Sequence, residues 1–240
     1  MGSISLREHI RWLPDEASEP TSTIVVTSPQ RRFVDLRIFR PTEGDQKNWS
    51  GHEEALPVDR LEWGIAGTSS SWMRDDGKGG QIRRSQWKHW IDSRTTKPEN
   101  ATDEGDMFPQ PDGTTLETGS MVNPATGKDT AYEEVWLDLD PIPTSSAEVK
   151  AIVLQIETET GGRGSVVRLG QCCQGILREG DLITAERWEW RAEKGWKRSI
   201  RMGDGVLPCE KVLDDGLVVK KGEVVEVGGN AWKAVEVSGE

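Results

Sequence analysis

Three polar side chains stand beside tryptophans in segments typical of β-strands, and they are the first candidates for acid or base chemistry. Glu62 precedes Trp63, while Tyr132 and Glu134 share one strand face with Trp136, because residues two apart in a strand point the same way. A carboxyl or phenol group that is desolvated against an aromatic wall can transfer a proton. We predict catalytic roles for all three; the alternative is a solvated charge or a hydrogen bond at a strand end.

A further candidate group surrounds the adjacent pair Cys172 and Cys173. In a strand, Gln171 would point with Cys173, and Cys172 would point to the other face. We add Gln171 to the catalytic candidates and Cys172 to the substrate contacts. With Cys209 the cysteines number three, and an odd count with one adjacent pair is no disulfide framework.

The sequence shows none of the common enzyme motifs. The three histidines, His9, His52 and His89, are scattered, and the cysteines lack the spacing of a zinc site. A nucleophile elbow, a phosphate-binding loop and a dinucleotide fingerprint are missing as well. We therefore predict no metal and no other cofactor, and we expect His89 to be structural or exposed.

Tryptophan is the most unusual feature of the composition, with eleven Trp against one Tyr and three Phe. Tryptophan fills cores, but it also lines ligand cavities, and a barrel of about eight strands can enclose one small ligand. We predict that a bulky hydrophobic substrate contacts four of these residues: Trp63, Trp87, Trp90 and Trp136. The alternative is that they fill the barrel interior or close its ends.

Alternation of apolar and polar residues predicts that strands position these side chains. In residues 33–40, Val34, Leu36 and Ile38 would share one face and the intervening residues the other, which is typical of a half-buried strand. Asp-Gly and Gly-Gly pairs recur between such segments and favour tight hairpins. The expected fold is all-β, with antiparallel up-and-down sheets that close into barrels.

The segment PIPTSS, residues 141–146, interrupts this pattern, and we place a domain boundary there. The expected domains are an N-terminal barrel over residues 1–143 and a C-terminal barrel over residues 144–240. Residues 5–13 would form a short helix or an irregular lead-in. The polar stretches 43–57 and 93–111 would be long loops.

The net charge of −11 argues against nucleic acid and anionic membranes as partners, since both require a basic face. No apolar run approaches the ~20 residues that span a bilayer. The first twelve residues lack the apolar core of a secretion signal, so we expect a cytoplasmic protein. Two glycosylation sequons, at Asn48 and Asn100, would then be unused.

Four stretches resemble the motifs of a known family. They are an EW-x-x-AGT stretch at residues 62–68, a Trp-Leu-Asp-type strand end at 90–92, an ETG turn at 117–119 that precedes Glu134 and Trp136, and an IVL…G…QG-x-L pattern at 152–177. Their order is similar to that in the fungal Hri family, named for a yeast protein that interacts with a casein kinase I homologue. The resemblance implies two tandem antiparallel barrels of the lipocalin-like, or calycin, type.

The chain also resembles small fungal enzymes of tropolone–sesquiterpenoid biosynthesis, a branch of meroterpenoid secondary metabolism. That resemblance implies a hetero-Diels–Alderase, which joins a tropolone quinone methide to a humulene-type alkene. Such a pericyclase needs no cofactor, because holding two apolar partners face to face can lower a barrier by ~7–11 kcal/mol. The alternative is a non-catalytic cytosolic protein of the Hri type, whose acidic surface binds a protein partner.

Overall fold

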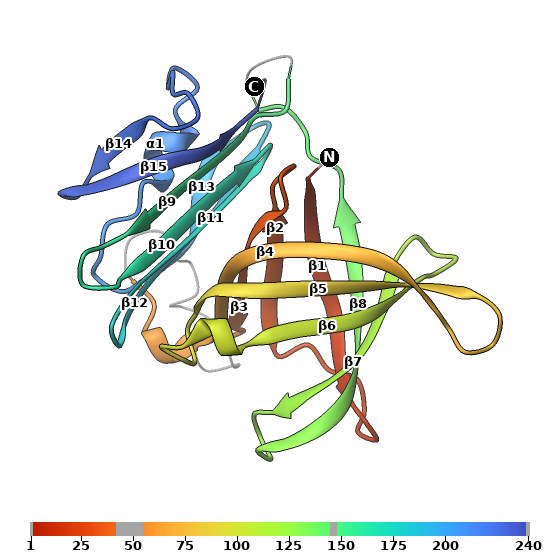
Figure 1. Cartoon of the computed structure of the whole chain (residues 1–240). Coiled ribbons are helices and arrows are strands. Elements are labelled where there is room, and N and C mark those ends of the chain that lie inside the picture. Colours follow the sequence, from red (N-terminus) through yellow and green to blue (C-terminus); the bar gives the residue numbers. More distant parts are fainter. Residues whose placement is uncertain (1, 42–54, 145–147, 239–240) are drawn as a thin grey trace.

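The computed structural model of the chain describes residues 2–41, 55–144 and 148–238, which form an all-β fold (Figure 1). The first eight strands make a closed antiparallel barrel, in which β1 pairs with both β2 and β8. Their bounds are β1 Ser3–Trp12, β2 Thr21–Thr27, β3 Arg32–Phe39, β4 Leu61–Asp75, β5 Gln81–Asp92, β6 Thr102–Pro109, β7 Thr115–Asn123 and β8 Lys128–Leu139.

The remaining strands form one seven-stranded antiparallel sheet, in the order β13-β12-β11-β10-β9-β15-β14. Their bounds are β9 Ala151–Glu157, β10 Arg163–Leu169, β11 Cys172–Glu179, β12 Leu182–Arg191, β13 Gly195–Met202, β14 Val224–Val227 and β15 Asn230–Val237. Helix α1, Cys209–Leu213, packs on one face of this sheet, where Trp232 is fully buried. Two short 3-10 helices, Val58–Arg60 and Pro98–Asn100, complete the described elements.

The all-β prediction is confirmed, but the predicted pair of barrels is not. In the described residues the second unit is a sheet with β13 and β14 at its two ends, so its strands do not close on themselves. The expected boundary at residues 141–146 falls between the end of β8 and the start of β9.

Two expectations about local structure were wrong. The segment 5–13, expected as a helix or lead-in, lies mostly in β1, because it supplies the pairing partner that closes the barrel against β8. The predicted loop 93–111 contains β6, whose polar residues pair with β5. Most of the other predicted loop, 43–57, and the sequon at Asn48 lie outside the described residues, whereas Asn100 is exposed.

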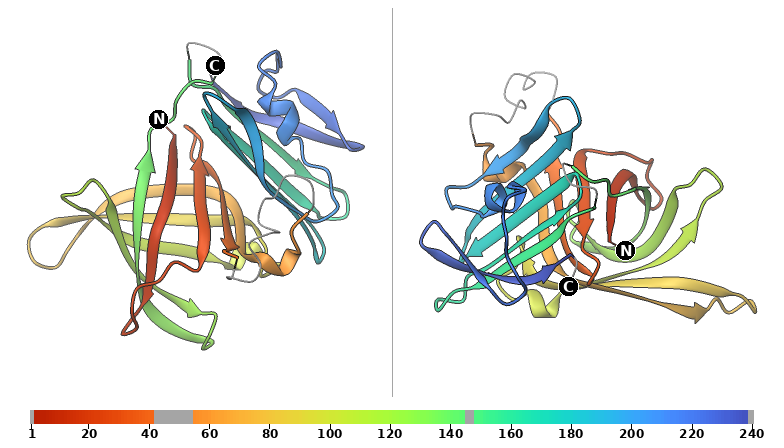
Figure 2. Two further views of the ribbon diagram at one scale, coloured as in Figure 1. Left: turned by 180° about the vertical axis from the view of Figure 1, so that it is seen from behind. Right: turned by 90° about the horizontal axis from the view of Figure 1, so that it is seen from above.

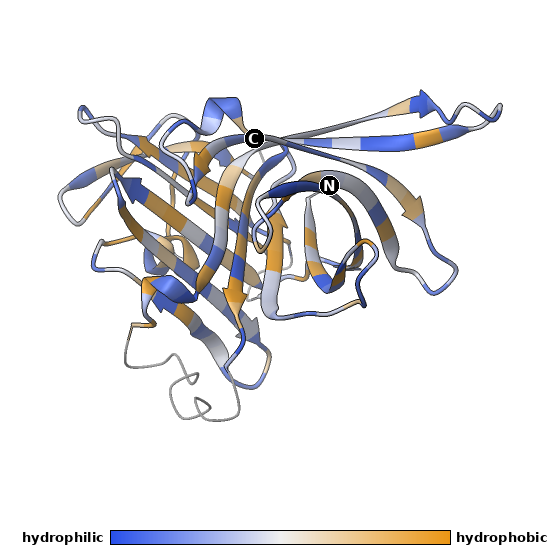
Figure 3. Cartoon of the chain, turned by 90° about the horizontal axis from the view of Figure 1, so that it is seen from below, coloured by the Kyte–Doolittle hydropathy of each residue, from blue (hydrophilic) through white to orange (hydrophobic). Residues whose placement is uncertain are grey.

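The outer wall of the barrel packs against the sheet, and this contact forms the main hydrophobic core (Figure 2). Apolar side chains of the barrel, such as Val26 and Leu36, meet Val153, Val167 and Ile176 of the sheet. Along the strands of both units, apolar residues alternate with polar ones (Figure 3). The sheet therefore covers the apolar outer side of β2 and β3, whose other side faces the barrel interior.

Two side chains of the sheet fasten it to the barrel backbone. Gln174 Nε2 donates to the carbonyl oxygens of Ile24, at 2.8 Å, and Val34, at 2.9 Å. The guanidinium of Arg187 donates to Leu36 O at 2.6 Å and to Ser22 Oγ at 2.9 Å. Burial lowers the pKa of Arg187 to about 10. Both side chains satisfy carbonyl groups at a boundary where water has been excluded.

Candidate functional site

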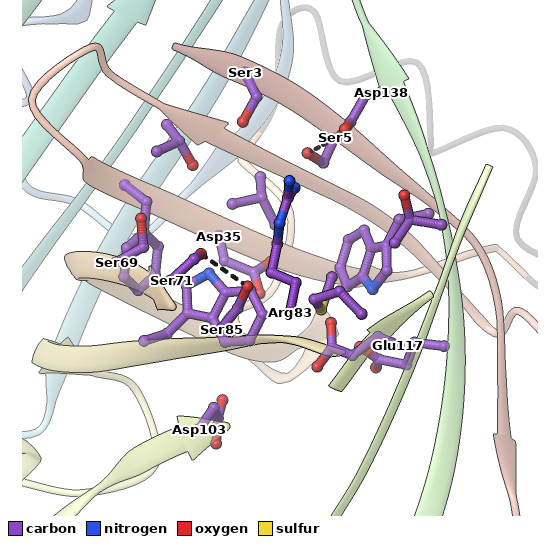
Figure 4. Close-up of a pocket in the computed structure, with 18 of the residues that line it drawn as sticks. Ser3, Ser5, Asp35, Ser69, Ser71, Arg83, Ser85, Asp103, Glu117 and Asp138 are labelled. Carbon is purple, nitrogen blue, oxygen red and sulfur yellow. Dashed lines mark hydrogen bonds between the residues drawn. The ribbon is translucent and has the colours of Figure 1, made fainter. Parts of the chain in front are cut away.

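The interior of the barrel holds a cavity of about 460 Å³, and all eight strands contribute to its lining. Figure 4 shows some of the side chains that line it. This volume lies within the range of roughly 300–1,000 Å³ that is typical of small-molecule sites. Apolar and aromatic side chains form much of the wall: Phe33, Ile65, Trp87, Met107, Met121 and Trp136. A barrel of eight strands is just wide enough to hold one such ligand beside its inward-facing side chains.

Part of the cavity wall is a network of buried ion pairs. Glu134 Oε1 accepts hydrogen bonds from Arg7 Nη1, at 2.5 Å, and from Arg37 Nη1, at 3.2 Å. Arg37 Nε donates to Asp35 Oδ2 at 3.0 Å, and Arg7 Nε donates to Glu19 Oε2 at 2.9 Å. Asp35, Arg37 and Glu134 line the cavity, so a ligand would meet charged groups that are already fixed in place.

Burial and pairing act against each other in this network. Burial lowers the pKa of Arg37, but Asp35 and Glu134 outweigh it, so the pKa lies well above its usual range. Burial raises the pKa of Asp35 despite its ion pair with Arg37. The desolvation cost of these charges is offset only while each keeps its partner.

A second pair, Glu117 and Tyr132, lines the same cavity. Tyr132 Oη donates a hydrogen bond to Glu117 Oε1 at 2.8 Å, and both side chains are buried. Burial, reinforced by the charge of Glu134, raises the pKa of Glu117 to about 8. At neutral pH this carboxyl group therefore holds its proton and can donate a hydrogen bond to a ligand.

Two glycines make room for this pair. A Cβ at position 105 would lie 2.5 Å from Glu117 Cγ, and a Cβ at position 119 would lie 2.6 Å from Tyr132 Oη. Both distances are too short for real side-chain contacts, so the absence of a side chain at Gly105 and Gly119 lets the acid and the phenol occupy the barrel interior.

His89 supports the cavity from behind. Its Nδ1 lies 2.9 Å from Asp92 Oδ2, and its Nε2 lies 3.4 Å from Asp103 Oδ2. Burial lowers the pKa of His89, but these two carboxylates outweigh it and raise the pKa to about 9, so the ring is an imidazolium at neutral pH. Asp103 lines the cavity, so the charge of His89 lies one residue behind the cavity wall.

The structure brings four of the nine predicted site residues together. Tyr132, Glu134, Trp87 and Trp136 all line the cavity. Trp63 lies next to it, in an apolar cluster with Trp136 and Phe33, and its Nε1 donates to Asp92 Oδ1 at 2.8 Å.

The other four predicted residues lie outside the cavity. Glu62 does not line the cavity: it is the extra residue at an irregularity of the β3–β4 pairing, and its carboxylate pairs with Arg94, which lies over the Trp63 ring. Gln171 sits in the β10–β11 turn and bonds the backbone of Asp140 and Ile142. Trp90 and Cys172 pack in the core between barrel and sheet, where burial raises the Cys172 pKa to about 12.

Sequence reasoning missed three charged or acidic groups of the cavity wall, Asp35, Arg37 and Glu117, and two residues behind it, Arg7 and His89. Asp35 and Arg37 alternate with apolar residues that were identified correctly, but the polar face of that strand was taken as the one toward solvent. Glu117 belongs to the ETG stretch, yet nothing in its neighbours indicates burial. A signal was available in β3, where Asp and Arg two residues apart on one face can pair.

Three further observations concern the described residues as a whole. None of their helices is long and apolar enough to cross a membrane. Within the same ranges, no three His, Cys, Asp or Glu side chains form a group suited to a metal ion. The three cysteines are free thiols, and all are buried.

Comparison with known proteins agrees with one of the two resemblances seen in the sequence, the one to the Hri family. A family model described as Protein HRI1 matches residues 3–236. The crystal structure of the uncharacterised protein YLR301w from Saccharomyces cerevisiae is similar, with a TM-score of 0.73, 20% identity and 99% of each chain covered. At this identity the likeness shows a shared fold. No curated protein matches significantly. Since the family model spans nearly the whole chain, this protein belongs to the HRI1 family.

Proposed function

We propose that the barrel binds a small, partly apolar organic molecule in its cavity. The observation that carries this proposal is a cavity of about 460 Å³ in the barrel. Phe33, Trp87 and Trp136 line one part of it, and fixed polar groups line another. Ligand sites in proteins combine these same two elements, since apolar walls give affinity and a few polar groups set orientation.

We further propose that the cavity promotes a reaction of a carbonyl compound without a cofactor. Protonated Glu117, held by Tyr132, is positioned to donate a hydrogen bond to a carbonyl oxygen and to draw electron density from a conjugated system. In the hetero-Diels–Alder reaction expected from the sequence, that oxygen belongs to the tropolone quinone methide. The aromatic wall would hold the humulene-type alkene against it.

This proposal changes the roles of the predicted residues. Glu134 already accepts hydrogen bonds from two guanidinium groups, so its role is to position Arg7 and Arg37. Glu117 takes the place of Glu62 as the acidic group. Tyr132 keeps its place as the residue that orients this acid.

Ligand binding is tested by tryptophan fluorescence with aromatic polyketides and terpenoids as probes. A ligand in the cavity should change the emission of Trp87 and Trp136, and single Phe substitutions at these positions should reduce the change. Trp72→Phe is the matched control, because Trp72 is 41% exposed and does not line the cavity. Unchanged emission with all probes at saturating concentration would refute the binding proposal.

The reaction is tested with purified protein, a hydroxymethyl tropolone and a humulene alcohol, without metal or cofactor. We expect product above the uncatalysed background, with one dominant stereoisomer. Glu117→Gln should lower the rate by ~10²-fold or more, in line with the loss of a general acid. Glu62→Gln should leave it unchanged, because this carboxylate pairs with Arg94 and does not line the cavity. Product at the background level would refute the catalytic proposal alone.

One observation favours the second candidate, a protein-interaction module. The β4–β5 hairpin projects beyond the barrel (Figure 1), and it exposes 41% of Trp72 and 53% of Met73. Exposed aromatic and methionine side chains are common in protein interfaces. For this function, Trp72→Ser should weaken binding of the kinase implied by the family resemblance and leave cavity binding unchanged. If Trp72→Ser binds the kinase as tightly as the wild-type protein does, the β4–β5 hairpin is not the interaction surface.

A further inference from the structure

Asp35 is the one cavity-lining carboxylate among the described residues with a buried oxygen that lacks a hydrogen-bond partner. Its Oδ2 accepts from Arg37 Nε, but its Oδ1 is shielded from solvent and accepts nothing within the described chain. The residue as a whole is only 4% exposed. An unpaired buried oxygen costs stability, and a ligand group that satisfies it regains that free energy on binding.

The polar groups around Asp35 come from several strands and are mostly occupied. On β3 itself, Arg37 points its Nε and Nη1 at Asp35 and Glu134. From β1, Arg7 is bound to Glu134, Glu19 and Thr21. Neither guanidinium donates to Asp35 Oδ1, and the neighbours of Asp35 in the paired strands, Val25 and Ile65, are apolar.

The buried part of the barrel also carries an excess of negative charge. With Glu117 protonated, the carboxylates in and directly behind the cavity outnumber the cations. The carboxylates are Glu19, Asp35, Asp92, Asp103 and Glu134, and the cations are Arg7, Arg37 and His89. Two more guanidinium groups, Arg31 and Arg83, line the cavity but are exposed, so solvent screens them.

We propose that the natural ligand presents a hydrogen-bond donor, a hydroxyl or an ammonium group, to Asp35 Oδ1. The inference rests on the proposed binding function and specifies the chemical class of the ligand. The donor group lies against the carboxylate, and the apolar body of the ligand packs against Trp87 and Trp136. The ether or methyl analogue of such a ligand leaves the oxygen unpaired and binds more weakly.

Three naphthalene probes that differ in one substituent test the inference by calorimetric titration of the full chain. They are 2-naphthol, 2-naphthylmethylammonium and 2-methoxynaphthalene, of which the last has no donor. We expect at least one donor probe to bind the wild-type protein about tenfold or more tightly than the ether, because hydrogen bonds to a charged group are strong. The tighter of the two donors identifies the head group.

Asp35→Asn sharpens the test. In this variant the amide oxygen can still accept the hydrogen bond from Arg37 Nε. The amide NH2 group then takes the place of Oδ1 and offers the ligand a donor where the wild-type protein offers an acceptor. The affinity for the ether probe, relative to that for the two donor probes, should therefore be higher in the variant than in the wild-type protein. Ser85→Ala is the matched control, because Ser85 lines the same cavity, bonds Ser71 and should leave the preference intact. Near-ultraviolet circular dichroism checks that each variant is folded.

The outcomes separate this inference from the binding proposal. If no probe binds the wild-type protein, the proposed binding function fails. If all three bind the wild-type protein with equal affinity, the cavity is a site but the donor inference is overturned, and this comparison needs no variant. A donor preference that survives in folded Asp35→Asn also overturns it, because another residue would then be the acceptor.

Discussion

Glu117→Gln removes the titrating proton from the cavity while it keeps the shape of the side chain and an acceptor for Tyr132. In the folded wild-type protein the pKa of Glu117 is about 8, against an ordinary value of 4.5. Between these pH values the folded protein binds more protons than the unfolded chain. The contribution of Glu117 to the free energy of unfolding is therefore fully present below pH 4.5 and is lost as the pH rises through 8.

The size of the effect follows from the same two values. Between pH 5 and pH 7 the unfolded carboxyl group releases its proton and the folded one retains it, which lowers the free energy of unfolding by up to ~1.4 kcal/mol per pH unit. Because Glu117 interacts with Glu134, we expect a smaller total, on the order of 2 kcal/mol over this range. Glu117→Gln has no titrating group at this position. Its free energy of unfolding, relative to that of the wild-type protein, should therefore rise by about 2 kcal/mol between pH 5 and pH 7.

The assay is urea denaturation of both proteins at pH 5, 6 and 7 and constant ionic strength, followed by tryptophan fluorescence. His89 titrates in both proteins, so the difference between them isolates position 117. A stability difference that stays constant across this range would show that Glu117 ionises in the folded protein as it does in the unfolded chain. That result would refute a neutral acid in the cavity.

Three further predictions concern the same barrel. Glu134→Ala leaves two buried guanidinium groups without their shared carboxylate and should lower the free energy of unfolding by about 3–5 kcal/mol; a loss below about 1 kcal/mol in urea denaturation would contradict the network. The His89 ring should remain protonated at pH 7.5 in an NMR titration, and an apparent pKa near 6.5 would show that its two carboxylates do not hold the charge. Gly119→Val should clash with Tyr132 and cost roughly 1–3 kcal/mol; an unchanged melting temperature would place the tyrosine elsewhere.

The sequence predicted strands well where one face is apolar. In β3, alternation identified Val34, Leu36 and Ile38 as a buried set, and they lie in the core between barrel and sheet. It did not reveal that Asp35 and Arg37 are buried too, because alternation distinguishes two faces and does not say what covers each one. A polar face turned into a barrel has the same pattern as one turned toward solvent.

The candidate site was harder to predict than the fold, for reasons of orientation. Glu62 and Trp63 are neighbours at an irregularity of the β3–β4 pairing, where simple alternation fails, and the sequence does not reveal where such an irregularity falls. Glu117 and Tyr132 meet across the β7–β8 pair, fifteen positions apart in the chain. Strand pairing explains why the second unit was predicted as a barrel. Closure depends on whether the two end strands, β13 and β14, pair with each other, and the sequence does not specify this.

Strand β3 is a wall shared by the cavity and the sheet. Its inward side chains, Asp35 and Arg37, belong to the cavity, while the carbonyl groups of Val34 and Leu36 are held by Gln174 and Arg187. A ligand that draws Asp35 inward also displaces the β3 backbone beside it. This displacement changes the hydrogen bonds that Gln174 and Arg187 donate to Val34 and Leu36. Occupancy of the barrel should therefore be detectable from the sheet, as altered amide hydrogen exchange in β11 and β12, far from any ligand contact.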